Sequence, residues 1–216
     1  MRTLFLLLVF LLFTSSSFAI DYKEIKKCYS SSYLYEAKGD YKKAIEALMP
    51  VYKAYPDGYA VNLRLGWLYY LLGKYSNSEY HYTKAVKVAP SSVEAKLGLT
   101  LPLIAQDRWS KVEETSYQIL KIDYYNYYGN LRLSYALRNE GKFSLAEAVD
   151  RKMLLLYPTS VDFLLELALS LYGEGKYSSS KEILRNLLIL SPNNKVAQEY
   201  LKKIGKLEKS SSSASN

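Results

Sequence analysis

Hydrophobic residues recur three and four positions apart along most of the chain. Between Val61 and Leu72, for example, apolar side chains stand at positions 61, 65, 68, 69 and 72. This spacing places them on one face of an α-helix, whereas a half-buried β-strand would alternate apolar and polar residues. The sequence therefore predicts an all-α protein.

Short turn signals divide these helical stretches at a constant spacing of 34 residues. The marks are Gly39, Gly73, Asp107, Gly141 and Gly175, and all but the third open a GDY, GKY or GKF triplet. A second series has the same period: Pro56, Pro90, Tyr124, Pro158 and Pro192. A fixed period in this range is typical of a solenoid of stacked helical repeats.

Each repeat is predicted to hold a first helix, a turn at the glycine, and a second helix that stops near the proline. The first helices are expected over 22–38, 59–72, 93–106, 127–140 and 161–174. The second helices are expected over 41–54, 75–88, 109–122, 143–156 and 177–190. A capping helix is predicted over 195–208, with Val196, Tyr200, Leu201, Ile204 and Leu207 toward the last repeat. The serine-rich residues 209–216 are predicted to be a disordered tail.

Small residues stand in register where the two helices of a repeat are expected to meet. On the first helices they are Ser32, Gly66, Thr100, Ser134 and Ala168. On the second helices they are Ala44, Ser78, Ala146 and Ser180, with Val112 as the exception. Close approach of two backbones requires such small side chains.

The repeats resemble the tetratricopeptide repeat, whose pattern is W-x2-L-G-x2-Y, then A-x3-F and a late proline. The second repeat carries the following matches: Leu65, Gly66, Tyr69, Ser78, Tyr82, Ala85 and Pro90. The resemblance covers five repeats, 25–58, 59–92, 93–126, 127–160 and 161–194, within a domain of 20–194. It implies a right-handed α-solenoid of stacked antiparallel helix pairs. The third repeat departs most from the tetratricopeptide pattern. Its Pro102 predicts a kink in the first helix of that repeat, which is either tolerated or acts as a hinge.

The resemblance also implies a concave inner surface, lined by one stripe of the first helices. We call these residues the aromatic stripe: Tyr29, Tyr33, Leu63, Trp67, Tyr70, Leu97, Leu101, Ile104, Tyr128, Leu131, Tyr135, Arg138, Leu165, Leu169 and Tyr172. Exposed apolar patches of this kind usually mark binding sites, and Tyr, Trp and Arg are enriched among interface anchors. The alternative is that neighbouring helices bury much of the stripe as ordinary core.

The sequence offers little for catalysis. His81 is the single histidine, expected at the surface or in packing, and no nucleophile pattern or glycine-rich phosphate loop accompanies it. We expect no catalytic residue, no metal site, no cofactor and no enzymatic activity.

Cys28 is the single cysteine and is predicted to be a core residue, with a reactive or pairing thiol as the alternative.

The first nineteen residues are predicted to be a secretory signal peptide. A charged start at Arg2 precedes an apolar run over 3–13, and Ser17 to Ala19 form a small-x-small cleavage site. The run is shorter than the about 20 residues needed to span a bilayer, so no integral span is expected after cleavage, although a retained anchor remains an alternative. The protein is therefore expected to be exported, most simply to a bacterial periplasm or envelope.

The composition of the chain limits the classes of partner that it is expected to bind. The net charge of +8 is scattered over the chain, which argues against nucleic acid, and 23 tyrosines indicate extended half-exposed faces. We predict a non-enzymatic interaction scaffold that binds a protein or peptide segment in the concave groove, in an envelope assembly. The alternatives are carbohydrate binding by stacked Trp and Tyr rings in polysaccharide export, and self-association. The tyrosine cluster at 123–130 is expected either to pack the repeat junction or to form a rim contact.

Overall fold

The computed structural model describes residues 20–213, and all the regular structure in that range is α-helical. The first helices of the repeats are α1 (Tyr22–Ala37), α3 (Tyr59–Leu71), α5 (Val93–Ile104), α7 (Tyr127–Asn139) and α9 (Val161–Gly173). The second helices are α2 (Tyr41–Ala54), α4 (Tyr75–Val88), α6 (Trp109–Ile122), α8 (Phe143–Leu154) and α10 (Tyr177–Leu190), and α11 (Lys195–Ser213) follows them. The ten predicted repeat helices are confirmed, with ends that differ by no more than two residues. The predicted signal peptide, 1–19, lies outside the described residues.

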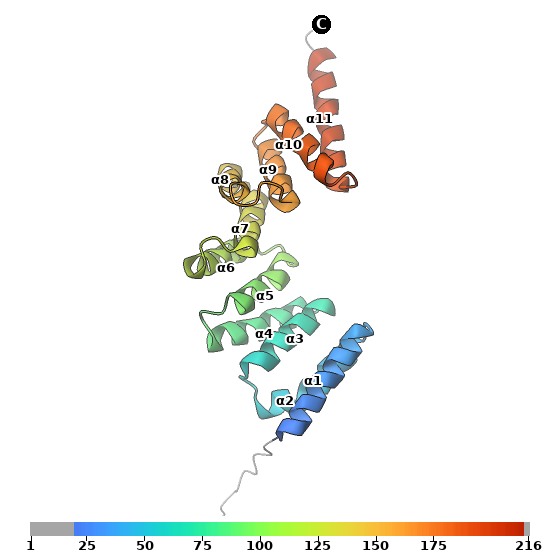
Figure 1. The fold of residues 1–216 in the computed structure, drawn as a ribbon, viewed down its shortest axis with the longest axis vertical. Coiled ribbons are helices and arrows are strands. Elements are labelled where there is room, and N and C mark those ends of the chain that lie inside the picture. The colour runs from blue at the N-terminus through green and yellow to red at the C-terminus, as the bar shows by residue number, and fades with distance from the viewer. Residues whose placement is uncertain (1–19, 214–216) are drawn as a thin grey trace, which may run out of the picture. The chain divides into compact units, whose positions relative to one another are not determined.

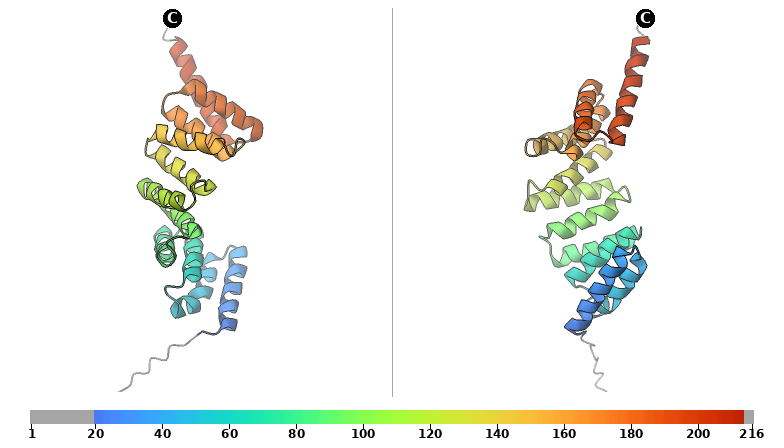
Figure 2. Two further views of the ribbon diagram at one scale, coloured as in Figure 1. Left: turned by 60° about the vertical axis from the view of Figure 1, so that its left-hand side comes forward. Right: turned by 45° about the vertical axis from the view of Figure 1, so that its right-hand side comes forward.

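The chain forms two compact units, Met1–Pro56 and Asp57–Asn216. In the first unit α1 packs against α2. In the second unit, α3 to α10 stack in chain order, each second helix contacting its own first helix and the first helix of the next repeat (Figures 1 and 2). Successive first helices also touch one another. The fold is thus an α-solenoid of antiparallel helix pairs.

The residues at these ten positions are all buried, as expected for contacts between paired helices. In the second repeat the Ser78 hydroxyl donates a hydrogen bond of 2.7 Å to the carbonyl of Gly66. In the fifth repeat Ser180 donates one of 2.7 Å to the carbonyl of Ala168. Serine therefore allows close approach and also gives its hydroxyl an acceptor inside the helix pair, which a buried polar group requires.

The turns between paired helices share one backbone conformation. Gly39, Gly73, Gly141 and Gly175 have φ between 72° and 77°, in the left-handed region that glycine enters without strain. Asp107 occupies the same place in the third repeat with φ of 53°. Aspartate is one of the few other residues that tolerate this region. The substitution that makes the third repeat look degenerate therefore preserves its turn.

Tyr82 fills the space between α3 and α5. Its ring is almost fully buried and lies against two glycines of the flanking first helices, Gly66 and Gly98. α5 continues through Pro102, whose missing N–H leaves the carbonyl of Gly98 without its helical donor. Gly98 thus stands where Pro102 removes a helical hydrogen bond, and its lack of a side chain leaves room for the Tyr82 ring.

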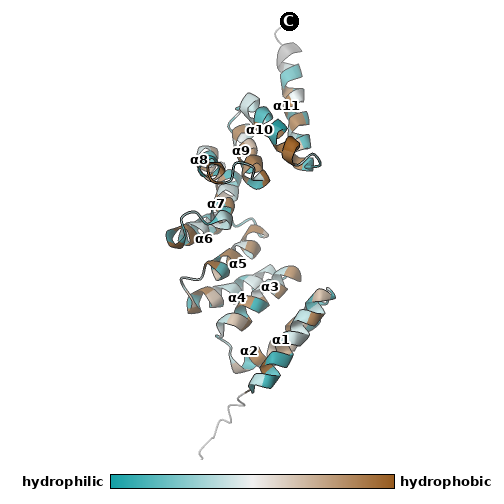
Figure 3. Cartoon of the chain, in the orientation of Figure 1, coloured by the Kyte–Doolittle hydropathy of each residue, from teal (hydrophilic) through white to brown (hydrophobic). Residues whose placement is uncertain are grey.

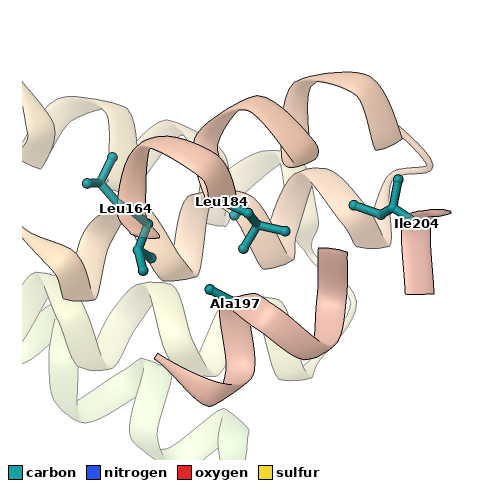
Figure 4. Packing of buried hydrophobic residues seen from close by; sticks show 6 residues of the cluster. Leu164, Leu184, Ala197 and Ile204 are labelled. Carbon is teal, nitrogen blue, oxygen red and sulfur yellow. The ribbon is translucent and has the colours of Figure 1, made fainter. Parts of the chain in front are cut away.

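α11 covers the last repeat, as the sequence predicts. Ala197 and Ile204 of α11 join a buried cluster with Leu164, Ala168, Leu184 and Leu187 of α9 and α10 (Figure 4). The prediction that Val196 and Leu207 join this face is wrong: Val196 is 40% and Leu207 39% exposed, and Ala197 is buried in place of Val196. α11 also runs past Glu208 to Ser213, since no glycine or proline interrupts the segment that was expected to be a tail.

Charged side chains join neighbouring repeats at the same 34-residue interval. Arg108 pairs with Glu79, and two further pairs repeat the arrangement one and two repeats later: Lys142 with Glu113 at 2.6 Å, and Lys176 with Glu147 at 3.0 Å. These pairs are at least partly exposed, so solvent screens them and each contributes little to stability. Their regular placement indicates that they fix the register between repeats.

In the second and fourth repeats, a tyrosine hydroxyl joins the first helix to the start of the next first helix. Tyr59 hydrogen-bonds to Ser92 (2.8 Å) and donates to Glu94 (3.0 Å) at the start of the next first helix. Sixty-eight residues later Tyr127 makes the same two contacts, to Ser160 (2.7 Å) and Asp162 (3.0 Å). The bridging serines also cap α5 and α9. The second and fourth repeats thus share a junction that the 34-residue period alone does not reveal.

Candidate binding surface

Most of the aromatic stripe lies in the second unit, on α3, α5, α7 and α9. Of its members there, Tyr128 is exposed, Leu169 is buried, and the others are partly buried. Half-burial means that each ring or aliphatic chain packs on a neighbour and still presents one side to solvent. Hydrophobic colouring is strong along α5 and α9 and paler on α4, which fits first helices that are apolar on more than one side (Figure 3).

Tyr29 and Tyr33 belong to the first unit, on α1. Tyr29 is partly buried and Tyr33 is 56% exposed. The buried face of α1 instead carries Cys28 and Ser32. Both tyrosines therefore lie away from the centre of the contact between α1 and α2.

Aromatic contacts hold the stripe of the second unit in place. Trp67 stacks on Tyr70 with ring centroids 5.8 Å apart. Tyr70 also makes a tilted ring contact with Tyr75, the first residue of α4, at a centroid distance of 5.9 Å. Trp109, the first residue of α6, meets Tyr135 edge-on at 5.4 Å. These contacts orient the rings before any partner binds, which lowers the entropy cost of binding.

The second helices all begin with an aromatic residue that sequence reasoning did not assign to this surface. These residues are Tyr41, Tyr75, Trp109, Phe143 and Tyr177. Those of the second unit support the first helices: Tyr75 contacts α3, Trp109 contacts α7, Phe143 lies against Gly173 of α9, and Tyr177 contacts Tyr172. An aromatic residue directly after each GK or equivalent pair was the signal that could have revealed them.

Arg138 is the charged member of the stripe. Its guanidinium donates to both oxygens of Glu166 on α9, at 2.6 and 3.5 Å, and lies 5.0 Å from the centre of the Tyr135 ring. Burial raises the pKa of Glu166, and Arg138 opposes this shift. The guanidinium is thus already committed to a carboxylate of its own chain, so it is less available to a ligand than the sequence implied.

The end of the stripe is partly covered by the capping helix. Leu165 and Tyr172 pack against the cluster shared by α9, α10 and α11, and Tyr172 meets Tyr200 edge-on at 4.8 Å. Leu169, at 8% exposure, offers little surface to a ligand. The most open part of the stripe in the second unit therefore lies on α3, α5 and α7.

The tyrosine cluster at 123–130 divides between packing and surface. Tyr127 contacts the rings of Tyr157 and Phe163 at 5.1 and 5.0 Å, and its burial raises its pKa. Tyr124 and Tyr125 pair edge-on with each other, and both remain more than half exposed. Tyr127 thus packs the junction, while its two neighbours are available at the surface.

His81 is a packing residue. Its ring is stacked on Tyr69 at 5.3 Å, and its Nδ1 lies 2.9 Å from Oδ1 of Asn62. The amide nitrogen of Asn62 donates to the carbonyl of Gly58, so Oδ1 is the acceptor and His81 Nδ1 carries the proton. Burial, and to a lesser extent Lys84, lowers the pKa of His81 to about 4.

This shift predicts a loss of stability in mild acid. Because the folded-state pKa lies below the ordinary value of 6.5, the unfolded chain binds more protons between pH 6.5 and 4, and stability falls as pH falls through this window. We expect a loss of about 1 kcal/mol between pH 7 and 5, allowing for partial solvent screening. His81→Gln should flatten this part of the curve in urea titrations followed by circular dichroism. An identical pH slope in both proteins would contradict it.

Cys28 is buried, as expected from the sequence, at 6% exposure on α1. Burial and the neighbouring Glu24 carboxylate raise the pKa of its thiol. A raised pKa disfavours the reactive thiolate. This agrees with the core interpretation of Cys28 and not with the reactive one.

Two further properties bear on the kind of site. Among residues 20–213, no three His, Cys, Asp or Glu side chains gather closely enough to hold a metal ion. In the same range no helix combines the length and apolar character that crossing a membrane would need.

Comparison with known proteins shows which fold the chain shares. The family model described as Tetratricopeptide repeat matches residues 29–93. A tetratricopeptide repeat protein from Parabacteroides merdae is similar over 84% of this chain and 72% of its own, with a TM-score of 0.78 and 19% identity. No curated protein matches the sequence.

Two other solved structures share the fold. MamA from Desulfovibrio magneticus RS-1 has a TM-score of 0.73 at 13% identity, covering 80% of this chain and 97% of its own. YrrB, described as a TPR protein with an unusual peptide-binding site, has a TM-score of 0.70 at 13% identity, covering 84% and 94%. Residues 29–93 match the tetratricopeptide repeat model, and the 34-residue period and the similar solved structures show that the described part of the chain has the tetratricopeptide repeat fold, with helix pairs for five repeats and a C-terminal capping helix.

Proposed function

We propose that the protein is a non-enzymatic, exported scaffold that binds a segment of a partner protein along the aromatic stripe of its first helices, within a cell-envelope assembly. The tetratricopeptide repeat fold is typical of protein–protein interaction. The observation that carries the proposal is the row of partly exposed rings and aliphatic chains on α3, α5 and α7, in which the rings of Trp67, Tyr70 and Tyr135 are already oriented by contacts with other rings.

The chemistry of the stripe favours an apolar or amphipathic segment. Its one cation in the second unit, Arg138, is bound to Glu166, which leaves aromatic and aliphatic surface as the main attraction. Large rigid rings give much contact area for little lost side-chain freedom. A peptide helix or an extended segment laid along the first helices would use this surface.

Export is proposed from the sequence of the first nineteen residues, which pair a charged start and a short apolar run with a small-x-small site. An exported scaffold would meet its partner in the envelope. N-terminal sequencing of the protein from the native cell would test this: a chain that begins after Ala19 supports export, and an intact Met1 with cytoplasmic recovery contradicts it.

Replacing Trp67 and Tyr70 by alanine should weaken binding of the natural partner several-fold, because both rings present one side to solvent and lose their contact area. Partners captured from native envelopes would be quantified by mass spectrometry, and helicity checked by circular dichroism. Tyr80→Ala is the control, since Tyr80 is an exposed tyrosine on α4 outside the stripe. Equal recovery of the same partners by all the variants would refute the assignment of this surface.

A further inference from the structure

A second apolar site lies away from the aromatic stripe, between the second helices α6 and α8. It is a cleft of about 620 Å³, within the range of pockets that hold small ligands. Leu120, Leu133 and Leu137 are buried residues that line it, and Leu145 and Val149 of α8 add further aliphatic surface. Tyr117, Lys121, Tyr124, Ala148 and Lys152 complete the lining.

The charged residues of the lining indicate which charge an occupant would carry. It contains two lysines and no acidic residue. Lys152 Nζ donates to the amide oxygen of Asn130 at 2.6 Å and lies 4.3 Å from the centre of the Tyr124 ring. Within the part of the chain that the structure describes, no carboxylate pairs with it. Desolvation lowers its pKa, which is the expected response of an ammonium group that burial has deprived of water without supplying an anion.

The equivalent lysine of the second repeat has a carboxylate partner, which Lys152 lacks among the described residues. Lys84 stands 68 residues before Lys152 and likewise lies over a tyrosine ring, that of Tyr80, at 5.3 Å. Lys84, however, pairs with Asp57 at 3.0 Å. The residue 68 positions after Asp57 is Tyr125, so the junction of the third and fourth repeats keeps the cation, Lys152, and has a tyrosine in place of the carboxylate. A partly buried cation beside an aliphatic cleft leaves both an apolar surface and an anion site unfilled.

We propose that this outer cleft binds an aliphatic carboxylate of the fatty-acid type. Its chain lies against Leu120, Leu137 and Val149, and its head group replaces the missing counter-ion of Lys152. Each methylene group that leaves water favours binding, and the charge-assisted hydrogen bond to the ammonium group orients the chain. The site is separate from the aromatic stripe, so it does not depend on the scaffold role proposed above.

The probe is sodium dodecanoate, titrated below its micelle concentration into the full chain by calorimetry. We expect binding of one equivalent to the cleft, and weaker binding by at least tenfold for dodecyl maltoside, which has the same chain and no charge. Lys152→Gln keeps a donor for Asn130 and removes the charge, and should weaken dodecanoate at least fivefold. Leu145→Glu, at an exposed position on the cleft wall, should abolish binding. Lys84→Gln is the matched control and should bind as the wild type does.

The other outcomes overturn the proposal. Equal binding of dodecanoate and dodecyl maltoside would show that the head group is not recognised. Binding that survives both Lys152→Gln and Leu145→Glu would place the amphiphile elsewhere, and no binding would remove the site. A short peptide ending in Leu-Leu that outcompetes dodecanoate would assign the cleft to a protein C-terminus. Self-association that Leu145→Glu abolishes, measured by light scattering, would assign it to a second copy of the chain.

Discussion

Gly98→Ala is expected to lower the free energy of unfolding by about 2 kcal/mol, the scale of adding a methyl group to a filled core. A β-carbon at Gly98 would lie 2.7 Å from Cδ1 and Cζ of Tyr82 and closer still to Cε1. The Tyr82 ring is 3% exposed and also lies against Gly66, so it has no room to move aside. The better helix propensity of alanine returns only part of the loss, about 0.5–1 kcal/mol.

The same substitution at Gly205 is the matched control and should have the opposite sign. Gly205 lies within α11, and a β-carbon there would meet no atom within 4 Å. Its replacement by alanine should stabilise the protein by about 0.5–1 kcal/mol through helix propensity alone. Urea denaturation followed by circular dichroism would measure both variants. Equal shifts for the two would show that the ring contact at Gly98 is unimportant.

Asp150→Asn should raise the free energy of unfolding at pH 7, also by about 2 kcal/mol, the scale of an unsatisfied buried polar group. Asp150 is fully buried in α8, at the place where the first, second and fifth repeats carry Leu48, Tyr82 and Leu184. Burial raises its pKa well above the ordinary range, with Glu166 and Glu147 adding to the shift, and Ser134 and Arg138 only partly opposing it.

The sign of the pH dependence follows from this shift. With a folded-state pKa above the unfolded value of 3.8, the folded chain binds more protons in the window above that value, so the contribution of Asp150 to stability falls as pH rises. The advantage of Asn over Asp should therefore grow from pH 4 toward pH 7. Glu182→Gln, an exposed change on α10, is the control. A variant that is less stable than wild type at pH 7 would show that the Asp150 carboxyl is better satisfied than its burial implies.

The local sequence pattern was enough to predict the helices, because each helix has its own apolar spacing and nearly every turn between paired helices has its own glycine. Even the third repeat follows the rule, since Asp107 adopts the left-handed conformation of the glycines. The candidate surface was less predictable. The exposure of a stripe residue depends on its neighbours: Leu169 is buried, whereas Trp67 and Tyr135, at equivalent positions of the 34-residue register, are only partly buried.

The sequence by itself determined the repeat, its period, the small residues at each helix contact and the helical cap, since all of these depend on neighbours within one or two turns of helix. Tertiary structure alone decided that Gly98 accommodates Tyr82, that Arg138 is bound to Glu166, and that Lys152 lies beside an apolar cleft whose lining, among the described residues, has no carboxylate. The pairs Tyr82–Gly98, Arg138–Glu166 and Lys152–Asn130 join residues 16 to 28 positions apart on different helices. Their existence depends on how the helices stack, and the stacking geometry is a property of the packed solenoid that no single stretch of the chain encodes.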